Sequence, residues 1–218
     1  MIVEFKYQDT PIKITSQDGE WIGERIRRDN MFYEIDLLHY IKSRFNDGVV
    51  LDIGANIGNH SIFFSKFIFE KTFAFETNPT NFNLLLENKR INNIGDDKLI
   101  LNNIAISDGN YKYANHDFLG NMGRSFIVEG DGELITKTLD DFDLPKIALI
   151  KMDVEGHELK VLKGAIKLIN RDFPHIVLEC NNYSDDFERV NPYMLQIGYK
   201  NTKVIDNMFY YEYQDISK

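Results

Sequence analysis

The chain has 218 residues, 43% of them hydrophobic, which is enough to form one sizeable folded core. Acidic residues outnumber basic residues by 34 to 25, and the formal net charge of −9 opposes binding to nucleic-acid phosphates. We therefore expect a single domain over residues 1–218 that has no nucleic-acid partner.

The compartment is predicted from the cysteine count and the apolar runs. Cys180 is the single cysteine, which excludes an internal disulfide and favours a reducing environment. The start, MIVEFKYQDTPIKIT, lacks the basic flank and apolar core of a signal peptide. No apolar run reaches the length that a membrane span requires. We expect a soluble, cytoplasmic protein with no membrane partner.

The first predicted elements are a hairpin and a helix. Apolar residues alternate on both sides of residues 8–11, which predicts a hairpin within an N-terminal extension, residues 1–28. A helix is predicted next, capped by Asp29 or Asn30 and ended by the sequence NDG. Its apolar residues recur at helical spacing: Met31, Ile35, Leu38 and Ile41.

From residue 49 onwards, apolar strands alternate with amphipathic helices. The predicted strands are VVLDI, TFAFE, LILNNIAI, IALIKMD and HIVLEC, and the predicted helices are 59–69, 79–92, 158–170 and 186–196. This alternation is typical of an α/β fold with a mainly parallel sheet covered on both faces. The last runs, NTKVID and MFYYEYQ, flank Asp206 and Asn207, which predicts an antiparallel C-terminal hairpin.

Residues 108–138 interrupt the alternation. They contain several glycines and two short strand-like pieces, YKYAN and RSFIVE. We predict an insertion over the edge of the sheet, and long loops at such edges commonly determine specificity.

The stretch VVLDIGANIGNHSIFFSKF joins a strand to a helix through a glycine turn. Ligands of open parallel sheets bind beyond the carboxyl ends of the strands. Gly54 and Gly58 permit a tight turn, and the helix after Gly58 offers amide donors to a carboxylate. Asn56 stands where a dinucleotide loop has a glycine that lets the backbone approach a pyrophosphate. The loop therefore favours a ligand without phosphates.

Two acids end the strands on either side of this turn. Asp52 is placed to face an amino group or its water shell. Glu76 follows the next strand and can accept hydrogen bonds from both hydroxyls of a ribose. A carboxylate, an amino group and a ribose occur together in S-adenosylmethionine. The alternative is that the glycines only form a turn and that Glu76 is a solvated strand end.

Three segments resemble the FkbM-type family of S-adenosylmethionine-dependent methyltransferases: VVLDIGANIGNHSIFFSK, TLDDF and IALIKMDVEGHELKVLKGA. The resemblance covers about residues 32–180. It implies a class I methyltransferase Rossmann-like fold with a seven-stranded, mostly parallel sheet, and usually O-methylation of a hydroxyl on a sugar or a similar small molecule.

The resemblance also implies positions for the methyl donor. It assigns the ribose to Glu76 and the adenine neighbourhood to Asn103 and Ala105. Asn59, the first residue of the following helix, is a further cofactor-binding candidate. The methionine end is assigned to the strand end and the loop: Asp52, Gly54, Asn56 and Gly58.

The sequence KMDVEGHE places the catalytic candidates Asp153, Glu155 and His157 beyond the fourth strand. Asp153 can orient the acceptor hydroxyl, take its proton or bind a metal. His157 is a natural general base because its ordinary pKa is near neutrality, and Asp153 would hold it in the useful tautomer. Alternatively, Glu155 and Glu158 favour the start of a helix electrostatically, and His157 has only a structural role.

A divalent metal is a further hypothesis from the same segment. Glu179 ends the neighbouring strand and joins Asp153 and Glu155 as an oxygen ligand. Ligands of this type suit Mg²⁺ or Mn²⁺.

Two rival functions remain open. An NAD-dependent oxidoreductase would keep the sheet and Glu76, but Asn56 disfavours it. A non-catalytic cofactor-binding module in an assembly would keep the fold without the chemistry. For the enzyme we expect a hydroxylated small molecule or a glycan as substrate, and a homodimer from general precedent.

Overall fold

The centre of the protein is a seven-stranded sheet in the order β11-β12-β10-β9-β3-β4-β5. The computed structural model describes residues 1–118, 121–129, 132, 134–180 and 186–214. The parallel strands are β3 Val49–Ile53, β4 Lys71–Phe75, β5 Leu99–Asn102, β9 Leu149–Met152 and β10 His175–Glu179. The strand β12 (Met208–Tyr213) runs antiparallel to β10 and pairs with β11 (Tyr199–Ile205). The predicted α/β class and antiparallel C-terminal hairpin are confirmed.

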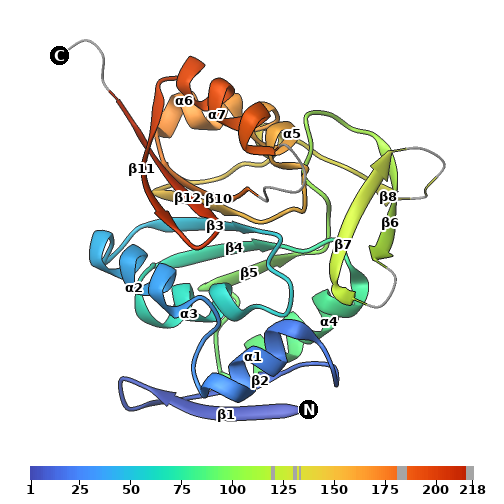
Figure 1. Ribbon diagram of the computed structural model, residues 1–218, viewed down its shortest axis with the longest axis vertical. Coiled ribbons are helices and arrows are strands. Elements are labelled where there is room, and N and C mark those ends of the chain that lie inside the picture. The colour runs from blue at the N-terminus through green and yellow to red at the C-terminus, as the bar shows by residue number, and fades with distance from the viewer. Residues whose placement is uncertain (119–120, 130–131, 133, 181–185, 215–218) are drawn as a thin grey trace.

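Helices cover both faces of this sheet (Figure 1). One face carries α5 Glu158–Lys163, α6 Ile166–Asp172 and α7 Asp186–Gln196, and the other carries α2 Ile35–Arg44, α3 Asn59–Phe67 and α4 Pro79–Ile91. Every residue of β3 is buried, because a central parallel strand has helices over both of its faces. No helix in the described part of the chain is both long and apolar enough to cross a membrane.

The N-terminal extension differs in part from the prediction. The hairpin is confirmed as β1 Ile2–Tyr7 and β2 Thr10–Thr15, but a helix that the sequence analysis missed follows it, α1 Trp21–Asp29. The next helix begins at Ile35 and is not capped by Asp29 or Asn30. The reason is that Asn30 (φ 50°) ends α1 in the left-handed conformation. Glu34 (φ 55°) adopts the same conformation, so the next helix can begin only after it.

The predicted helix 158–170 is divided at Gly164 into α5 and α6. A Cβ atom at Gly164 would lie 1.9 Å from the carbonyl oxygen of Ser107, so this close approach requires a glycine. Asp140, in the sequence TLDDF and in the short 3₁₀ helix Leu139–Asp141, then accepts hydrogen bonds from the amides of Lys167 (3.0 Å) and Leu168 (2.9 Å). The motifs TLDDF and VLKGA therefore contact each other where α5 ends and α6 begins.

The predicted insertion contains a sheet of its own. The strands β6 Lys112–Phe118, β7 Asn121–Glu129 and β8 Leu134–Ile135 pair in the order β7-β6-β8. The pieces YKYAN and RSFIVE fall on β6 and β7, as predicted, and positions 119–120, 130–131 and 133 lie outside the described residues. The small sheet stands beyond the carboxyl ends of the central parallel strands (Figure 1).

The hairpin is attached to the main body by side chains of α4. Asn88 is fully buried; its Oδ1 accepts from the Thr15 amide (2.6 Å), and its Nδ2 donates to the carbonyls of Thr15 (2.9 Å) and Ile57 (2.8 Å). Asn92, one helical turn later, accepts from the Lys13 amide at 3.1 Å. These amides satisfy the free edge of β2 as another strand would.

The substitution Asn88→Ala should lower the free energy of unfolding by about 3 kcal/mol, because it leaves three backbone groups near the core without their partner. Urea denaturation followed by circular dichroism measures the change. Asn170→Ala, at an exposed position on α6, is the matched control and should have almost no effect. A loss below about 1 kcal/mol for Asn88→Ala would show that water replaces the side chain.

Candidate active site

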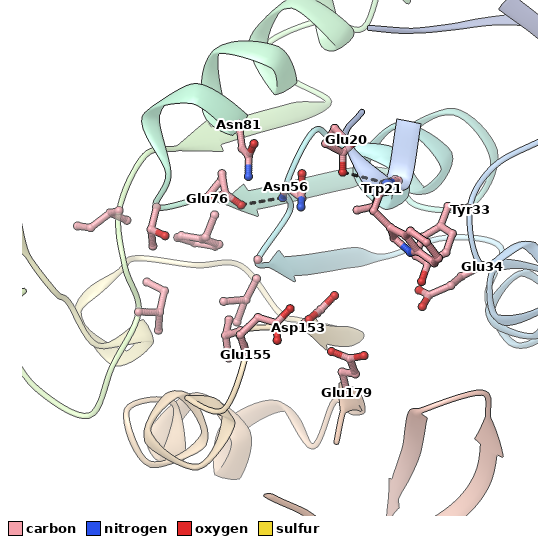
Figure 2. Close-up of a pocket in the computed structure, with 18 residues that line it drawn as sticks. Glu20, Trp21, Tyr33, Glu34, Asn56, Glu76, Asn81, Asp153, Glu155 and Glu179 are labelled. Atoms are coloured by element: carbon pink, nitrogen blue, oxygen red, sulfur yellow. Dashed lines mark hydrogen bonds between the residues drawn. The ribbon is translucent and has the colours of Figure 1, made fainter. Parts of the chain in front are cut away.

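A cavity of about 400 Å³ opens at the carboxyl ends of β3, β4, β9 and β10. Six of its lining residues are acidic, and no lysine or arginine is among the described residues that line it. The acids are Glu20, Glu34, Glu76, Asp153, Glu155 and Glu179 (Figure 2). A cavity with charges of one sign attracts the opposite sign, so this one favours a cationic or neutral ligand over a phosphate.

The glycine turn forms one wall of the cavity. Gly54 has φ 77°, and a Cβ atom there would lie 1.8 Å from the carbonyl oxygen of Asp153, so no other residue fits. The amides of Gly54 and Ala55 both donate to the Phe75 carbonyl, at 2.9 and 3.0 Å. Asn56 (φ 49°) also adopts the left-handed conformation, and its Oδ1 accepts from the Ile57 amide at 2.7 Å. This local bond explains why asparagine is tolerated in the turn.

Glu76 joins the turn to the end of β4. Its Oε2 accepts from the Asn56 amide and its Oε1 from the Asn78 amide, both at 2.7 Å (Figure 2 shows the first). Only 6% of the residue is exposed. Burial raises the pKa of Glu76 to about 7, although the amide donors oppose this change. Its carboxylate is therefore a buried acceptor that titrates near neutrality.

Asp52 lies beneath the turn and not on the cavity wall. It is fully buried; its Oδ1 is 3.3 Å from Lys151 Nζ, and its Oδ2 accepts from Ser61 Oγ at 2.5 Å. Lys151 also donates to the Gly54 carbonyl at 3.4 Å. Burial would lower the pKa of Lys151, but Asp52 and other acids outweigh it and raise that pKa. The expectation that Asp52 faces an amino group is corrected: in this structure it supports the turn through Lys151.

Asn59 is likewise not among the residues that line the cavity, but it positions one that is. Its Nδ2 donates to the Tyr33 carbonyl and its Oδ1 accepts from the Tyr33 amide, both at 3.0 Å. Tyr33 and Glu34, which this contact positions, do line the cavity. His60 Nε2 lies 3.2 Å from Glu34 Oε2. Burial opposes the ionisation of Glu34, but His60 and Lys151 outweigh it and hold the Glu34 pKa below its usual value.

The segment after β5 contributes different residues from those predicted. Ile104 and Ile106 line the cavity together with Phe75. Asn103 is exposed, and its Nδ2 donates to the Glu76 carbonyl at 2.7 Å. Ala105 is fully buried, and its carbonyl accepts from the Lys137 amide at 3.0 Å. The predicted adenine neighbourhood, Asn103 and Ala105, is near the cavity. The residues that line the cavity are instead Ile104 and Ile106, each one position later in the chain.

Three of the predicted acids meet at the ends of β9 and β10. Asp153, Glu155 and Glu179 each offer a carboxylate oxygen, and these oxygens all lie within 4.8 Å of one another (Figure 2). Burial, followed by the charge of Asp153, raises the pKa of Glu179 far above its ordinary value. Glu158 instead supports the turn, because its Oε1 accepts from the amides of Val154 (3.3 Å) and Gly156 (3.2 Å).

His157 lies outside the cavity lining. Its Nε2 is 2.9 Å from Ser107 Oγ, and the residue stands at the N-cap position of α5 without a side-chain capping bond. Glu155 (φ 51°) and Gly156 (φ 94°) turn the chain just before it. Because His157 is not among the described residues that line the cavity with Asp153, its role as a general base stays a prediction.

Residues of the N-terminal extension complete the cavity and were missed by the sequence analysis. Glu20, Trp21 and Ile22 line it at the start of α1. The Glu20 carboxylate accepts from the amides of Ile22 (2.9 Å) and Gly23 (2.7 Å), and so begins the helix. The signal available in the sequence was an acid at position 20 followed by the one tryptophan of the chain.

Comparison with known sequences matches the family described as "Methyltransferase FkbM domain" to residues 52–200. The hexuronic acid methyltransferase AglP of Haloferax volcanii is 34% identical over 122 residues, which are 54% of this chain and 50% of that protein. The chain thus spans about half the length of the curated relative that it matches.

Two solved structures show the same fold. A methyltransferase FkbM from Methylobacillus flagellatus KT superposes with a TM-score of 0.56 at 21% identity, over 77% of this chain and 44% of that one. A ribosomal protein L11 methylase from Lactobacillus delbrueckii subsp. bulgaricus has a TM-score of 0.55 at 13% identity, over 83% and 78% of the two chains.

The raised pKa of Glu76 predicts a pH-dependent stability. The folded protein holds this proton more tightly than the unfolded chain, whose pKa is near 4.5. Wild type should therefore lose stability relative to Glu76→Gln as the pH rises from 4.5 to 7, by roughly 3 kcal/mol in all. Denaturant unfolding of both proteins across this range measures the difference.

Glu87, a partly exposed residue of α4, supplies a control for the sign of the pH dependence. A hydrogen bond from Arg90 lowers the pKa of Glu87, so wild type should gain slightly, relative to Glu87→Gln, as the pH rises to about 4.5, and should change little across the range in which Glu76 loses stability. If the Glu76 difference stays flat with pH, the buried carboxylate does not titrate as described.

Proposed function

The chain belongs to the FkbM family of methyltransferases, and on this premise we propose that it transfers a methyl group from S-adenosyl-L-methionine to a hydroxyl of a sugar or glycan. The proposal rests chiefly on the charge of the cavity, which has six acidic side chains and no basic one among its described lining residues. S-adenosylmethionine carries a sulfonium and an ammonium group. NAD carries a pyrophosphate, which these carboxylates would repel.

The donor's nucleoside belongs at the β4–β5 side of the cavity. Glu76 accepts two backbone amides and has carboxylate lone pairs left for the ribose hydroxyls. Ile104, Ile106 and Phe75 form an apolar wall for the adenine. Glu34, which is held ionised, is the acid available to the donor's ammonium group now that Asp52 is seen beneath the turn.

The acceptor belongs at the β9–β10 side, above Asp153. The bound donor supplies an electrophilic methyl carbon. The acceptor oxygen must approach that carbon opposite the sulfur, and its bond forms as the carbon–sulfur bond breaks. Asp153 orients the hydroxyl and takes its proton. Glu179, whose raised pKa keeps it protonated at neutral pH, donates a hydrogen bond to Asp153 and limits the repulsion between them.

A divalent metal would fit the same side chains in place of the proton on Glu179. Asp153, Glu155 and Glu179 form an all-oxygen ligand set of the type that Mg²⁺ and Mn²⁺ accept. A bound ion would lower the pKa of an acceptor hydroxyl. It would also offset the negative charge that otherwise disfavours an acidic sugar, and a hexuronic acid is the acceptor named for the relative AglP.

The substitution Asp153→Asn tests the assigned chemistry. It should lower kcat by about 10²- to 10⁴-fold, because the proton acceptor is lost. The affinity for S-adenosylhomocysteine, measured by calorimetry, should change less than about twofold. The assay uses isotopically labelled methyl donor with a panel of hexoses, hexuronic acids, nucleotide sugars and oligosaccharides, read by mass for one added methyl group.

Asp143→Asn, at an exposed position outside the cavity lining, is the matched control and should leave kcat unchanged. Unchanged turnover in Asp153→Asn would move the chemistry to another residue. Normal cofactor binding with no methylation of any sugar by wild type would favour the non-catalytic module.

Chelation tests the metal. EDTA should abolish turnover, and Mg²⁺ or Mn²⁺ should restore it. Direct titration with Mn²⁺, followed by electron paramagnetic resonance, should show one bound ion per chain in wild type and at least tenfold weaker binding in Glu179→Gln. Full activity in EDTA together with no bound Mn²⁺ would refute the metal hypothesis and leave Asp153 as the base.

A further inference from the structure

We propose that Trp21 is an aromatic platform on which the ring of the acceptor sugar stacks, so that α1 determines acceptor specificity. This inference rests on the proposed function, and it assigns to the N-terminal extension a role outside the matched segment 52–200. It concerns substrate binding and not the transfer step.

Trp21 combines two properties that a core tryptophan lacks. It lines the cavity, and 55% of it is exposed. An exposed indole beside six carboxylates leaves a large apolar surface in water, which a ligand can cover favourably. The Arg25 guanidinium lies over one face of the ring, 5.3 Å from its centroid, so the opposite face is the one left for a sugar.

The platform is held in place by its own helix. Glu20 caps α1 directly before Trp21. Gly23 packs so closely on the hairpin that a Cβ atom there would lie 2.0 Å from Ser16 Oγ, and Ile26 is fully buried. An anchored helix presents the indole with little loss of conformational freedom on binding.

The position of Trp21 favours the acceptor over the adenine. Trp21 and Glu76 lie on opposite sides of Asn56, and Trp21 is beside Tyr33 (Figure 2). A nucleoside bound through Glu76 and the wall of Ile104 and Ile106 extends away from the indole. Tyr33 closes this end, and burial, followed by the charge of Glu34, raises its pKa to about 12, so its hydroxyl stays protonated.

The chemistry of a sugar suits this surface. One face of a pyranose ring presents C–H groups that are slightly positive, and the face of an indole is negative. The hydroxyls at the ring edge remain free for the carboxyl groups of Asp153 and Glu179. Stacking therefore fixes the plane of the sugar, while hydrogen bonds select the hydroxyl that faces the methyl carbon.

The sequence makes this inference directly measurable, because Trp21 is the one tryptophan of the chain. Its fluorescence reports on this position alone. Protein saturated with S-adenosylhomocysteine is titrated with methyl glycosides of hexoses and of hexuronic acids, with sorbitol as an acyclic hydroxylated control that has no ring face. A saturable emission change with a glycoside, and a weaker one with sorbitol, is expected.

Kinetics with the sugar methylated most rapidly in the panel supply the second measurement. Trp21→Ala should raise the acceptor KM about tenfold or more and change kcat less than threefold, while Trp21→Phe keeps most of the affinity. Leu195→Ala is the matched control, because Leu195 is equally exposed (56%) but lies on α7. The KM for S-adenosylmethionine should stay unchanged in all three variants.

The outcomes separate this inference from the proposed function. An emission change caused by S-adenosylhomocysteine alone, with none from any glycoside, would make Trp21 part of the donor site and overturn the inference. An unchanged acceptor KM in Trp21→Ala would overturn it also, with methyl transfer intact. Failure of S-adenosylhomocysteine to bind in calorimetry would instead refute the proposed function.

Discussion

The site depends on one buried ion pair between neighbouring strands. Asp52 on β3 and Lys151 on β9 are directly opposite in the parallel register, and their charged atoms are 3.3 Å apart with almost no exposure. Lys151 also reaches the Gly54 carbonyl, so the pair holds the glycine turn against the strand that ends next to Asp153. Burying two charges costs more than a hydrophobic pair would, which indicates a role in geometry and not in stability.

A second constraint follows from the charges above that pair. The free cavity holds acidic groups that repel one another: the raised pKa of Glu179 reflects burial and then this repulsion, whereas the raised pKa of Glu76 reflects burial. The positive charge of Lys151, beneath the glycine turn, offsets part of this negative charge. Lys151 is, however, already bound to Asp52 and to the Gly54 carbonyl. A cationic ligand would therefore relieve repulsion that the free protein retains, and part of its affinity would come from this relief.

The sequence predicted the parts that depend on local rules. Strand ends, turn glycines and Glu76 follow from periodicity and topology, and so does the meeting of Asp153 with Glu179. The direction of Asp52 was not predictable, because a strand buried on both faces has no alternation to reveal it. The place of His157 outside the cavity lining was not predictable, because the turn before it depends on positive φ at Glu155, an unusual conformation for that residue type. Trp21 was missed because α1 is short and its contacts are distant in sequence.

The cavity is built from two parts of the chain, one inside the segment that matches the family and one before it. The turn, Glu76 and the three acids lie within the segment that matches the family, and in the proposed function they form the donor side and the reacting centre. Glu20, Trp21, Tyr33 and Glu34 come from residues before that segment, yet they close the same cavity. Because α1 is tied to the hairpin, and the hairpin to α4 through Asn88, this wall is fixed to the family core by contacts that leave its exposed side chains free to vary. Acceptor specificity can therefore change on the N-terminal wall without disturbing the chemistry beneath it.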